Sequence, residues 1–228
     1  MDAASERTEE LHGLRGRLVA WLALVGTVAA IGYATRFSNA PRERDVVFKW
    51  STAISELITF AIILGIDLWI ARGLPRREVF ALRAPIDWGR AAALGFGVFA
   101  VIWIVSIALG PLLHPDREQG LAPDHWEPAH AGAFALNLVA LAVVGPIVEE
   151  LTFRGLGYSL LRPYGLTTAI LGIGVLFALW HGLVQALPVL IVFGAGLAYL
   201  RSRTDSVYPG MILHMLFNAL ALLIAVTL

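Results

Sequence analysis

The sequence predicts an all-α protein that crosses a membrane several times, and three observations support this prediction. Hydrophobic residues make up 58% of the 228 positions and charged residues only 15%, whereas a soluble domain has about half and about a quarter. The mean hydropathy is +0.74. Runs of about 18 or more mainly apolar residues recur along the chain, and each is long enough to cross a bilayer. We therefore expect a polytopic transmembrane helix bundle with about seven spans, or eight at most.

Polar loops separate most of the predicted spans. An eighth span would have to come from a region such as Glu78–Trp88, which we predict to be an amphipathic segment on the membrane surface. The seven predicted spans are Leu18–Tyr33, Val47–Ala71, Ala91–Leu113, Ala131–Val148 with a helical continuation, Leu166–Val184, Pro188–Leu200 and Tyr208–Leu228.

The amino-terminal region and the arginines predict an orientation. Residues 1–17 are polar and mixed in charge, and the apolar run after them is long enough to span a bilayer. We therefore interpret that run as the first transmembrane helix and not as a cleavable signal. Lysine and arginine concentrate in alternate loops, which favours a cytoplasmic N-terminus.

Charge and cysteine content exclude several kinds of partner. The formal net charge is zero, so there is no basic surplus for a nucleic acid. Cysteine is absent, which excludes disulfides and thiolate metal sites. Any metal would have to be held by histidine and carboxylate side chains.

Ionisable side chains inside the predicted spans are the candidates for function, because a charge in the bilayer centre is costly and usually faces the protein interior. We assign Glu56 and Asp67, which are eleven residues apart in the second span, to helix packing or to a polar cavity. The remaining candidates lie in the fourth, fifth and seventh spans, and they are Glu149, Glu150, His181 and His214.

The adjacent glutamates are predicted to differ in their partners. Neighbouring residues on a helix point about 100° apart, so Glu149 and Glu150 cannot face the same group. Arg154 lies four residues after Glu150, which predicts an ion pair and leaves Glu149 free. Pro146 is expected to bend the helix just before them. Alternatively, the two glutamates mark the cytoplasmic end of the span.

A helical hairpin would place His181 beside Glu149. The turn is predicted at Pro163–Gly165, about 15 residues after Glu149 and about 16 before His181, so both side chains would reach the same depth. We therefore expect a carboxylate next to an imidazole. A hydrogen-bonded core histidine is the alternative for His181.

His214 and Asn218 are four residues apart and share one face of the seventh span. Both can donate hydrogen bonds to a developing oxyanion, as acyl transfer requires, although interhelical hydrogen bonding would also explain them. His214 is about 10 Å from the turn at Arg203–Asp205, which places the predicted site in the cytoplasmic third of the membrane.

A second acidic and histidine-rich segment lies in the loop before the fourth span. Its spacing matches no metal-binding motif, so we interpret it as a solvated loop. Its residues are Asp124, His125, Glu127 and His130.

Three short motifs point to a family. Glu149–Gly155 reads Glu-Glu-Leu-Thr-Phe-Arg-Gly, Phe177–His181 reads Phe-Ala-Leu-Trp-His, and His214–Asn218 reads His-Met-Leu-Phe-Asn. They resemble the EExxxR, FxxxH and HxxxN motifs of the CPBP family, the type II CAAX prenyl endopeptidases and their bacterial Abi relatives. The resemblance covers roughly Ala131 to Leu220, without a departure at the motif positions.

The resemblance implies a domain organisation and a location. Residues 1–130 would form an N-terminal membrane region of three spans, which resembles nothing known, and residues 131–228 would form a CPBP-like catalytic core of four spans. Both would belong to one integral membrane domain. We expect that domain in a bacterial inner membrane.

The family implies a glutamic intramembrane endopeptidase that acts on membrane-associated, and in some members prenylated, peptides. By position, Glu149 with His181 would activate a water molecule, and His214 with Asn218 would stabilise the oxyanion. A buried carboxylate in a helix bundle suits a general base.

The resemblance also implies supporting residues, namely Glu150, Arg154 and Phe177. We expect no cofactor, although zinc is a chemically reasonable alternative. Its ligands would be Glu149, His181 and His214.

Two other functions stay open on the sequence. One is a non-catalytic membrane protein, such as a bacteriocin-immunity or scaffold protein. The other is a proton-coupled transporter that uses Glu149, His181 and His214 as a relay, although transporters often have internal repeats and none is evident here. The sequence indicates neither the side-chain specificity for a substrate nor the oligomeric state.

Overall fold

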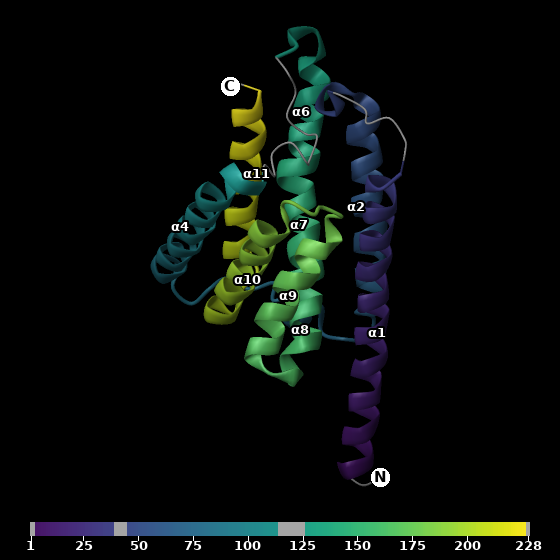
Figure 1. Cartoon of the computed structure of the whole chain (residues 1–228). Helices are drawn as coiled ribbons and strands as arrows, with labels where there is room; N and C mark the ends of the chain where they lie inside the picture. Colours follow the sequence, from purple (N-terminus) through teal and green to yellow (C-terminus); the bar gives the residue numbers. More distant parts are fainter. Residues whose placement is uncertain (1–2, 39–44, 114–125, 227–228) are drawn as a thin grey trace.

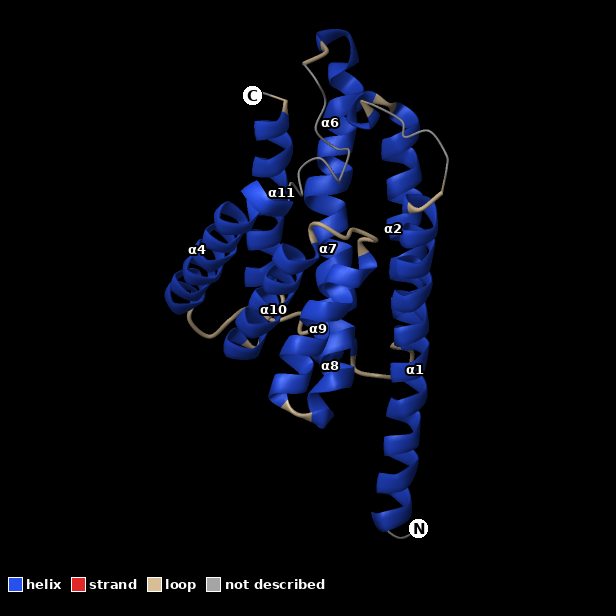
Figure 2. Cartoon of the chain, viewed as in Figure 1, coloured by secondary structure: helices blue, strands red, loops and turns tan. Residues whose placement is uncertain are grey.

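The computed structural model describes residues 3–38, 45–113 and 126–226, and within these ranges the chain is helical and contains no strand (Figures 1 and 2). The predicted all-α membrane bundle is confirmed. The α-helices are α1 (Ala3–Arg36), α2 (Trp50–Ile70), α3 (Arg76–Val79), α4 (Trp88–Leu113), α6 (Ala131–Val139), α7 (Gly145–Glu150), α8 (Tyr158–Leu161), α9 (Leu166–Trp180), α10 (Leu187–Thr204) and α11 (Tyr208–Ala225). Short 3₁₀-helices and π-helices are η1 (Val46–Phe48), η2 (Pro128–His130), η3 (Ala140–Val144), η4 (Leu151–Gly157) and η5 (Arg162–Tyr164).

The helices follow the order of the predicted spans, and their number fits roughly. Five segments of the described chain are long and apolar enough to cross a membrane, and α9 is a shorter apolar helix. α10 lies at the position of the sixth predicted span. The fifth span ends earlier than expected, because α9 stops at Trp180 and Gly182 adopts a left-handed backbone (φ +61°). The five long segments are Gly13–Arg36, Trp50–Ile70, Trp88–Leu113, Pro128–Tyr164 and Tyr208–Ala225.

The segment Glu78–Trp88, predicted to be amphipathic and to lie on the membrane surface, is mostly not helical. Its helix, α3, ends at Val79 after a single turn, and Phe80 and Ala81 are buried. The Phe80 ring packs against the backbone of Gly155, where a Cβ atom would lie 2.9 Å from it. The segment is therefore anchored into the bundle by its apolar residues and supplies no eighth span.

Residues 128–164 form one continuous helical rod with two π-helical stretches, η3 and η4, on either side of α7. Pro146 is the second residue of α7 and follows η3 after Gly145. Proline lacks the N–H of a helical hydrogen bond and clashes with the preceding turn. The sequence predicts a bend here, and the structure shows that the helix widens into a π-helix just before Pro146; π-helical turns of this kind are frequent at functional sites.

The rod passes between two flanks of the molecule. α1 and α2 lie side by side on one flank, and α4 lies on the other, beside α10 and α11 (Figure 1). α9 and α10 pack closely at Gly174 and Gly194, where an added Cβ atom would lie 2.9 Å from the opposite helix. Small residues allow such close backbone approach in membrane helices.

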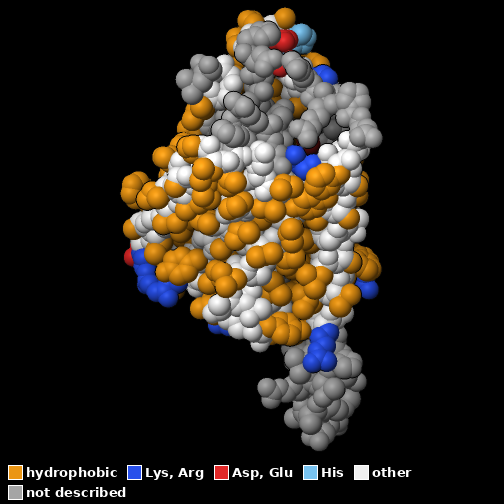
Figure 3. All heavy atoms as spheres, viewed as in Figure 1, with side chains coloured by type: hydrophobic (Ala, Val, Ile, Leu, Met, Phe, Trp, Pro, Cys, Tyr) orange, Lys and Arg blue, Asp and Glu red, His pale blue; other side chains and the backbone are white. Residues whose placement is uncertain are grey.

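The outer surface fits a bilayer. On the face shown in Figure 3, hydrophobic side chains cover a broad band, and Lys and Arg side chains lie towards the ends of this band. Phe96, Ile104 and Ile107 on α4 are more than 60% exposed. Contiguous apolar surface of this kind is expected where a protein meets lipid, so the chain is an integral membrane protein.

Candidate active site

A buried ion pair joins Glu150 to Arg154, as the i, i+4 spacing predicts. The Arg154 Nη1 atom donates to Glu150 Oε1 over 2.8 Å, and both side chains are completely buried. The guanidinium also donates to the Gly194 carbonyl (3.1 Å) and lies 4.4 Å from the centre of the Phe177 ring. The pair is therefore locked into the centre of the bundle by α9 and α10.

His214 of α11 reaches both glutamates. Its Nδ1 atom is 3.0 Å from Glu150 Oε1, and its Nε2 atom is 3.7 Å from Glu149 Oε2. Gly210, one turn earlier on α11, makes room for this contact, because a Cβ atom there would lie 2.6 Å from Glu150 Oε2. The sequence indicated no role for Gly210, and only its position four residues before His214 could have suggested one.

The two glutamates differ in their access to solvent. The Glu150 side chain is fully buried, whereas 13% of the Glu149 side chain is exposed. Glu150 accepts hydrogen bonds from both Arg154 and His214. Of the two carboxylates, Glu149 is therefore the one that water can reach.

The structure shows a contact of Glu149 with His214, over 3.7 Å, and, within the described ranges, no direct bond of the kind expected with His181. Among the described residues, no hydrogen bond or ion pair joins Glu149 to His181. The Nδ1 atom of His181 instead lies 2.8 Å from the Phe177 carbonyl oxygen. Counting residues from the turn gives the depth of Glu149 and His181 along the helix axes, but it does not give the rotation of each helix. In addition, α9 ends just before His181.

Both histidines contact the Phe177 ring. Ring-centre distances are 4.7 Å from Phe177 to His181 and 5.8 Å from Phe177 to His214. The three motifs thus meet around Phe177, which the guanidinium of Arg154 also contacts.

Asn218 lies one turn after His214 on α11, as predicted, and is partly buried. Its amide donates to the Leu141 carbonyl over 3.0 Å, and Leu141 is part of the η3 π-helix. An amide nitrogen has two hydrogens, so the second one is available for another acceptor.

Glu56 and Asp67, which the sequence grouped together, have different surroundings. Glu56 on α2 is partly buried. Asp67 is fully buried, and its Oδ2 atom is 2.6 Å from the hydroxyl of Thr152. Thr152 stands between the glutamates and Arg154 in the first motif, but its hydroxyl was not recognised from the sequence as part of the site.

The described residues form no cluster of side chains suited to a metal ion. Within the described ranges, no three side chains of histidine, aspartate or glutamate lie close enough to hold a metal ion. The Nδ1 atoms of His181 and His214 are both turned to protein oxygens. We therefore derive no metal-dependent step.

An ion pair lies where the loop meets the start of the rod. Glu127 Oε2 and His130 Nδ1 lie 2.6 Å apart at the surface. The other two residues of the loop that the sequence singled out, Asp124 and His125, lie outside the described residues.

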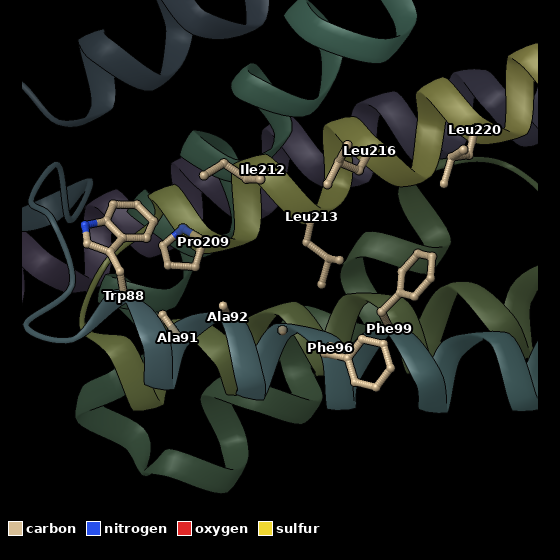
Figure 4. Close-up of a pocket in the computed structure, with 11 residues that line it drawn as sticks. Trp88, Ala91, Ala92, Phe96, Phe99, Pro209, Ile212, Leu213, Leu216 and Leu220 are labelled. Carbon is tan, nitrogen blue, oxygen red and sulfur yellow. The ribbon is translucent and has the colours of Figure 1, made fainter.

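An apolar groove of about 380 Å³ lies between α4 and α11 (Figure 4). A row of aromatic rings connects its wall to the site, from Phe99 to Phe217 (6.3 Å), from Phe217 to Phe193 (5.0 Å) and from Phe193 to His214 (4.9 Å). The lining residues are Trp88, Ala91, Ala92, Gly95, Phe96, Phe99, Pro209, Ile212, Leu213, Leu216 and Leu220.

Residues 131–220 match a protein-family model described as type II CAAX prenyl endopeptidase Rce1-like. This match agrees, for that segment, with the family resemblance drawn from the three motifs. The segment is less than half of the chain, and α1, α2 and α4 lie outside it. No curated protein and no solved structure matches the chain.

Proposed function

We propose that the protein is an intramembrane endopeptidase in which Glu149 is the general base that activates water. The observation that carries this proposal is the unequal environment of the two glutamates. Glu150 is fully buried and bonded to Arg154, whereas Glu149 is partly exposed and lies 3.7 Å from His214 Nε2. Two carboxylates with different surroundings commonly take different roles in hydrolysis.

His181 is the partner of Glu149 in activating water. Its Nδ1 atom lies against the Phe177 carbonyl, which can only accept, so Nδ1 carries the proton and Nε2 presents a lone pair. Water held by Glu149 and Nε2 attacks the peptide carbonyl and gives up a proton to the base. The proton then passes to the leaving amine as the peptide bond breaks.

The negative charge on the tetrahedral intermediate is stabilised by His214 and Asn218. The Nδ1 atom of His214 is directed to Glu150, and its Nε2 atom faces the side of Glu149, where it can donate to the oxyanion when it carries a hydrogen. The second amide hydrogen of Asn218 adds a donor one turn further along α11. Donors that are already in place when charge develops provide much of the rate acceleration in such sites.

The groove between α4 and α11 is the proposed place for a hydrocarbon chain on the substrate. It runs from Trp88 and Pro209 to Phe99 and Leu220, eleven residues on each helix, which is about 16 Å. Half of a bilayer core is about 15 Å thick. Leu213, which lines the groove, directly precedes His214, so a lipid-modified peptide could place its chain in the groove and its peptide bond near the site.

The orientation proposed from the arginines has support in the way the loops meet. Arg17 at the start of the first span donates to the Arg72 carbonyl (2.8 Å), and Arg83 pairs with Asp205 after α10. Each of these two contacts therefore joins two of the arginine-rich segments. The proposed cytoplasmic face is tested by labelling single cysteines with an impermeant reagent, which is straightforward because the chain has no native cysteine. Ser202→Cys should be labelled from the cytoplasm and Ser38→Cys from the opposite side.

Cleavage assays in membranes test the proposed activity. Wild type, Glu149→Gln and His181→Ala are compared on prenylated and unmodified peptides, with products identified by mass spectrometry. Glu78→Gln, at an exposed position away from the site, is the control. We expect the two site variants to lose cleavage by about 10²-fold or more and the control to retain it.

Other outcomes of that assay contradict the proposal in different ways. Unchanged cleavage in both site variants would exclude Glu149 as the base. Proton-coupled flux without any peptide product would favour a transporter. Activity that a chelator abolishes and zinc restores would overturn the metal-free mechanism.

A further inference from the structure

We propose that the first two helices position the catalytic glutamates by holding Thr152 from two sides, with Asp67 of α2 on its hydroxyl and Trp21 of α1 on its carbonyl. This inference rests on the proposed function. Both helices lie outside the segment 131–220 that matches the family model. The residues that hold Thr152 therefore come from a part of the chain that carries none of the motifs.

The burial of the Asp67 carboxyl group costs free energy. Its side chain is completely buried within α2, and among the described residues its Oδ1 atom has no hydrogen-bond partner. Burying a carboxyl group without full compensation costs free energy, and such groups in membrane helices usually have a function. The other carboxyl oxygen of Asp67, Oδ2, accepts a hydrogen bond from the hydroxyl of Thr152 over 2.6 Å.

Thr152 connects this carboxyl group to the helix that carries the site. Its hydroxyl also lies 2.9 Å from the carbonyl oxygen of Val148, the residue directly before Glu149. Thr152 itself stands between Glu150 and Arg154. Any movement of Thr152 would therefore be passed to both members of the buried ion pair and to the base.

Trp21 holds the same residue through its backbone. The indole Nε1 atom donates to the Thr152 carbonyl oxygen over 3.0 Å, and the indole is fully buried. Its six-membered ring lies so close to Gly157 that a Cβ atom there would be 2.2 Å away. The ring of Phe153 meets it edge to face at 6.0 Å. The indole therefore fits against the whole of η4.

The element held in this way is a π-helix, and this makes its support important. A π-helical turn is rare and usually marks a functional site. One residue more per turn rotates the side chains that follow, so the place of Arg154 relative to Glu150 depends on η4 keeping its form. Bonds from α1 and α2 to Thr152 stabilise that form from outside the helix.

The test compares substitutions that keep or remove each bond. Thr152→Ser keeps the hydroxyl, Thr152→Val removes it with little change in shape, and Asp67→Asn keeps an oxygen that can accept from Thr152. Thr167→Val, at an exposed position on α9, is the matched control. We expect Thr152→Val to lower kcat by about 10²-fold, the effect of a displacement of about 1 Å at a catalytic group, with KM little changed. Thr152→Ser, Asp67→Asn and the control should stay within a few fold of wild type.

A second measurement does not depend on activity. Hydrogen exchange of residues 148–158 is followed in the Glu149→Gln background, with and without Thr152→Val or Trp21→Phe. Faster exchange confined to this segment, with an unchanged thermal midpoint for the whole protein, is the expected result. Exchange that stays the same would overturn the proposal, as would a loss of kcat that only follows the loss of folded protein.

The two proposals fail in different ways. If Glu149→Gln is inactive and Thr152→Val is fully active, the positioning role is wrong and the proposed function stands. If Glu149→Gln retains full cleavage, the proposed function is wrong, and the exchange measurement alone then decides whether α1 and α2 hold η4.

Discussion

The N-terminal helices and the C-terminal helices contribute to the site in different ways. The segment 131–220 supplies every side chain with a proposed chemical role, and all three motifs meet around Phe177. The N-terminal helices supply contacts to the backbone and to supporting side chains, from Trp21 and Asp67 to Thr152 and from Arg36 to Gly182. The difference shows that reacting groups and the groups that position them can lie in separate parts of one chain.

The largest expected effect concerns the pair at the centre of the C-terminal helices. Arg154→Met should lower the free energy of unfolding by about 3–5 kcal/mol, because it leaves Glu150 charged and buried without its partner. The double variant Glu150→Leu with Arg154→Met should be less destabilised than the single one. Thermal unfolding in detergent measures both, and additive effects would contradict the pairing.

The next effect lies where α1 meets the turn that carries His181. Arg36 Nε donates to the Gly182 carbonyl over 2.7 Å. Arg36→Met should destabilise the protein by about 1.5–3 kcal/mol, the range for hydrogen bonds to charged groups, and it should lower kcat through His181. Arg162→Met, at an exposed position, is the control. Equal stability of the two variants would show that the N-terminal helices do not support this turn.

A smaller effect is expected in the groove that α4 shares with α11. Ala92 lines the groove and Ala93 does not, although both are exposed. Ala92→Phe should raise KM for a lipid-modified peptide about tenfold, or about 1.4 kcal/mol, because it displaces part of the hydrocarbon chain. Ala93→Phe should leave KM unchanged.

The same pair of variants is then measured on an unmodified peptide. KM should now be equal for both, since no chain enters the groove. A rise in KM for Ala92→Phe on both peptides would mean that the substitution disturbs the site itself and that the groove does not bind the substrate's chain.

The smallest effect is expected at the surface contact between the two regions. Arg83, before α4, pairs with Asp205, after α10. Partial burial raises the pKa of Asp205, but hydrogen bonds from Arg83 and Arg201 outweigh this and hold the pKa below its usual value. The pair therefore stabilises the protein above the usual pKa of aspartate and loses this effect as the pH falls through the lowered pKa.

Because Asp205 is mostly exposed, Asp205→Asn should cost less than about 1 kcal/mol at neutral pH. Unfolding midpoints of wild type and variant, measured from neutral pH down to acid, should converge as Asp205 becomes protonated. A difference that persists at the acid end would show that the contact does not act through the charge of Asp205.

Local features of the site were predictable because residues four apart lie on the same side of a helix. The Glu150–Arg154 pair and the common face of His214 and Asn218 follow from a spacing of four residues. The partner of Glu149 was not predictable in the same way. Depth along a helix follows from counting residues, but rotation depends on packing and on the two π-helical stretches, which place His214 near Glu149.

The sequence by itself determined that this chain is a helical membrane protein with a site built from three motifs. Lipid offers no hydrogen bonds, so long apolar runs must become helices, and local spacing then sets which side chains share a face. Only the tertiary structure decided which helices meet. Gly210 makes room for Glu150, and Asp67 and Trp21 meet at Thr152, because side chains from distant parts of the chain fit together in space. Such fits leave no periodic signal in a single sequence.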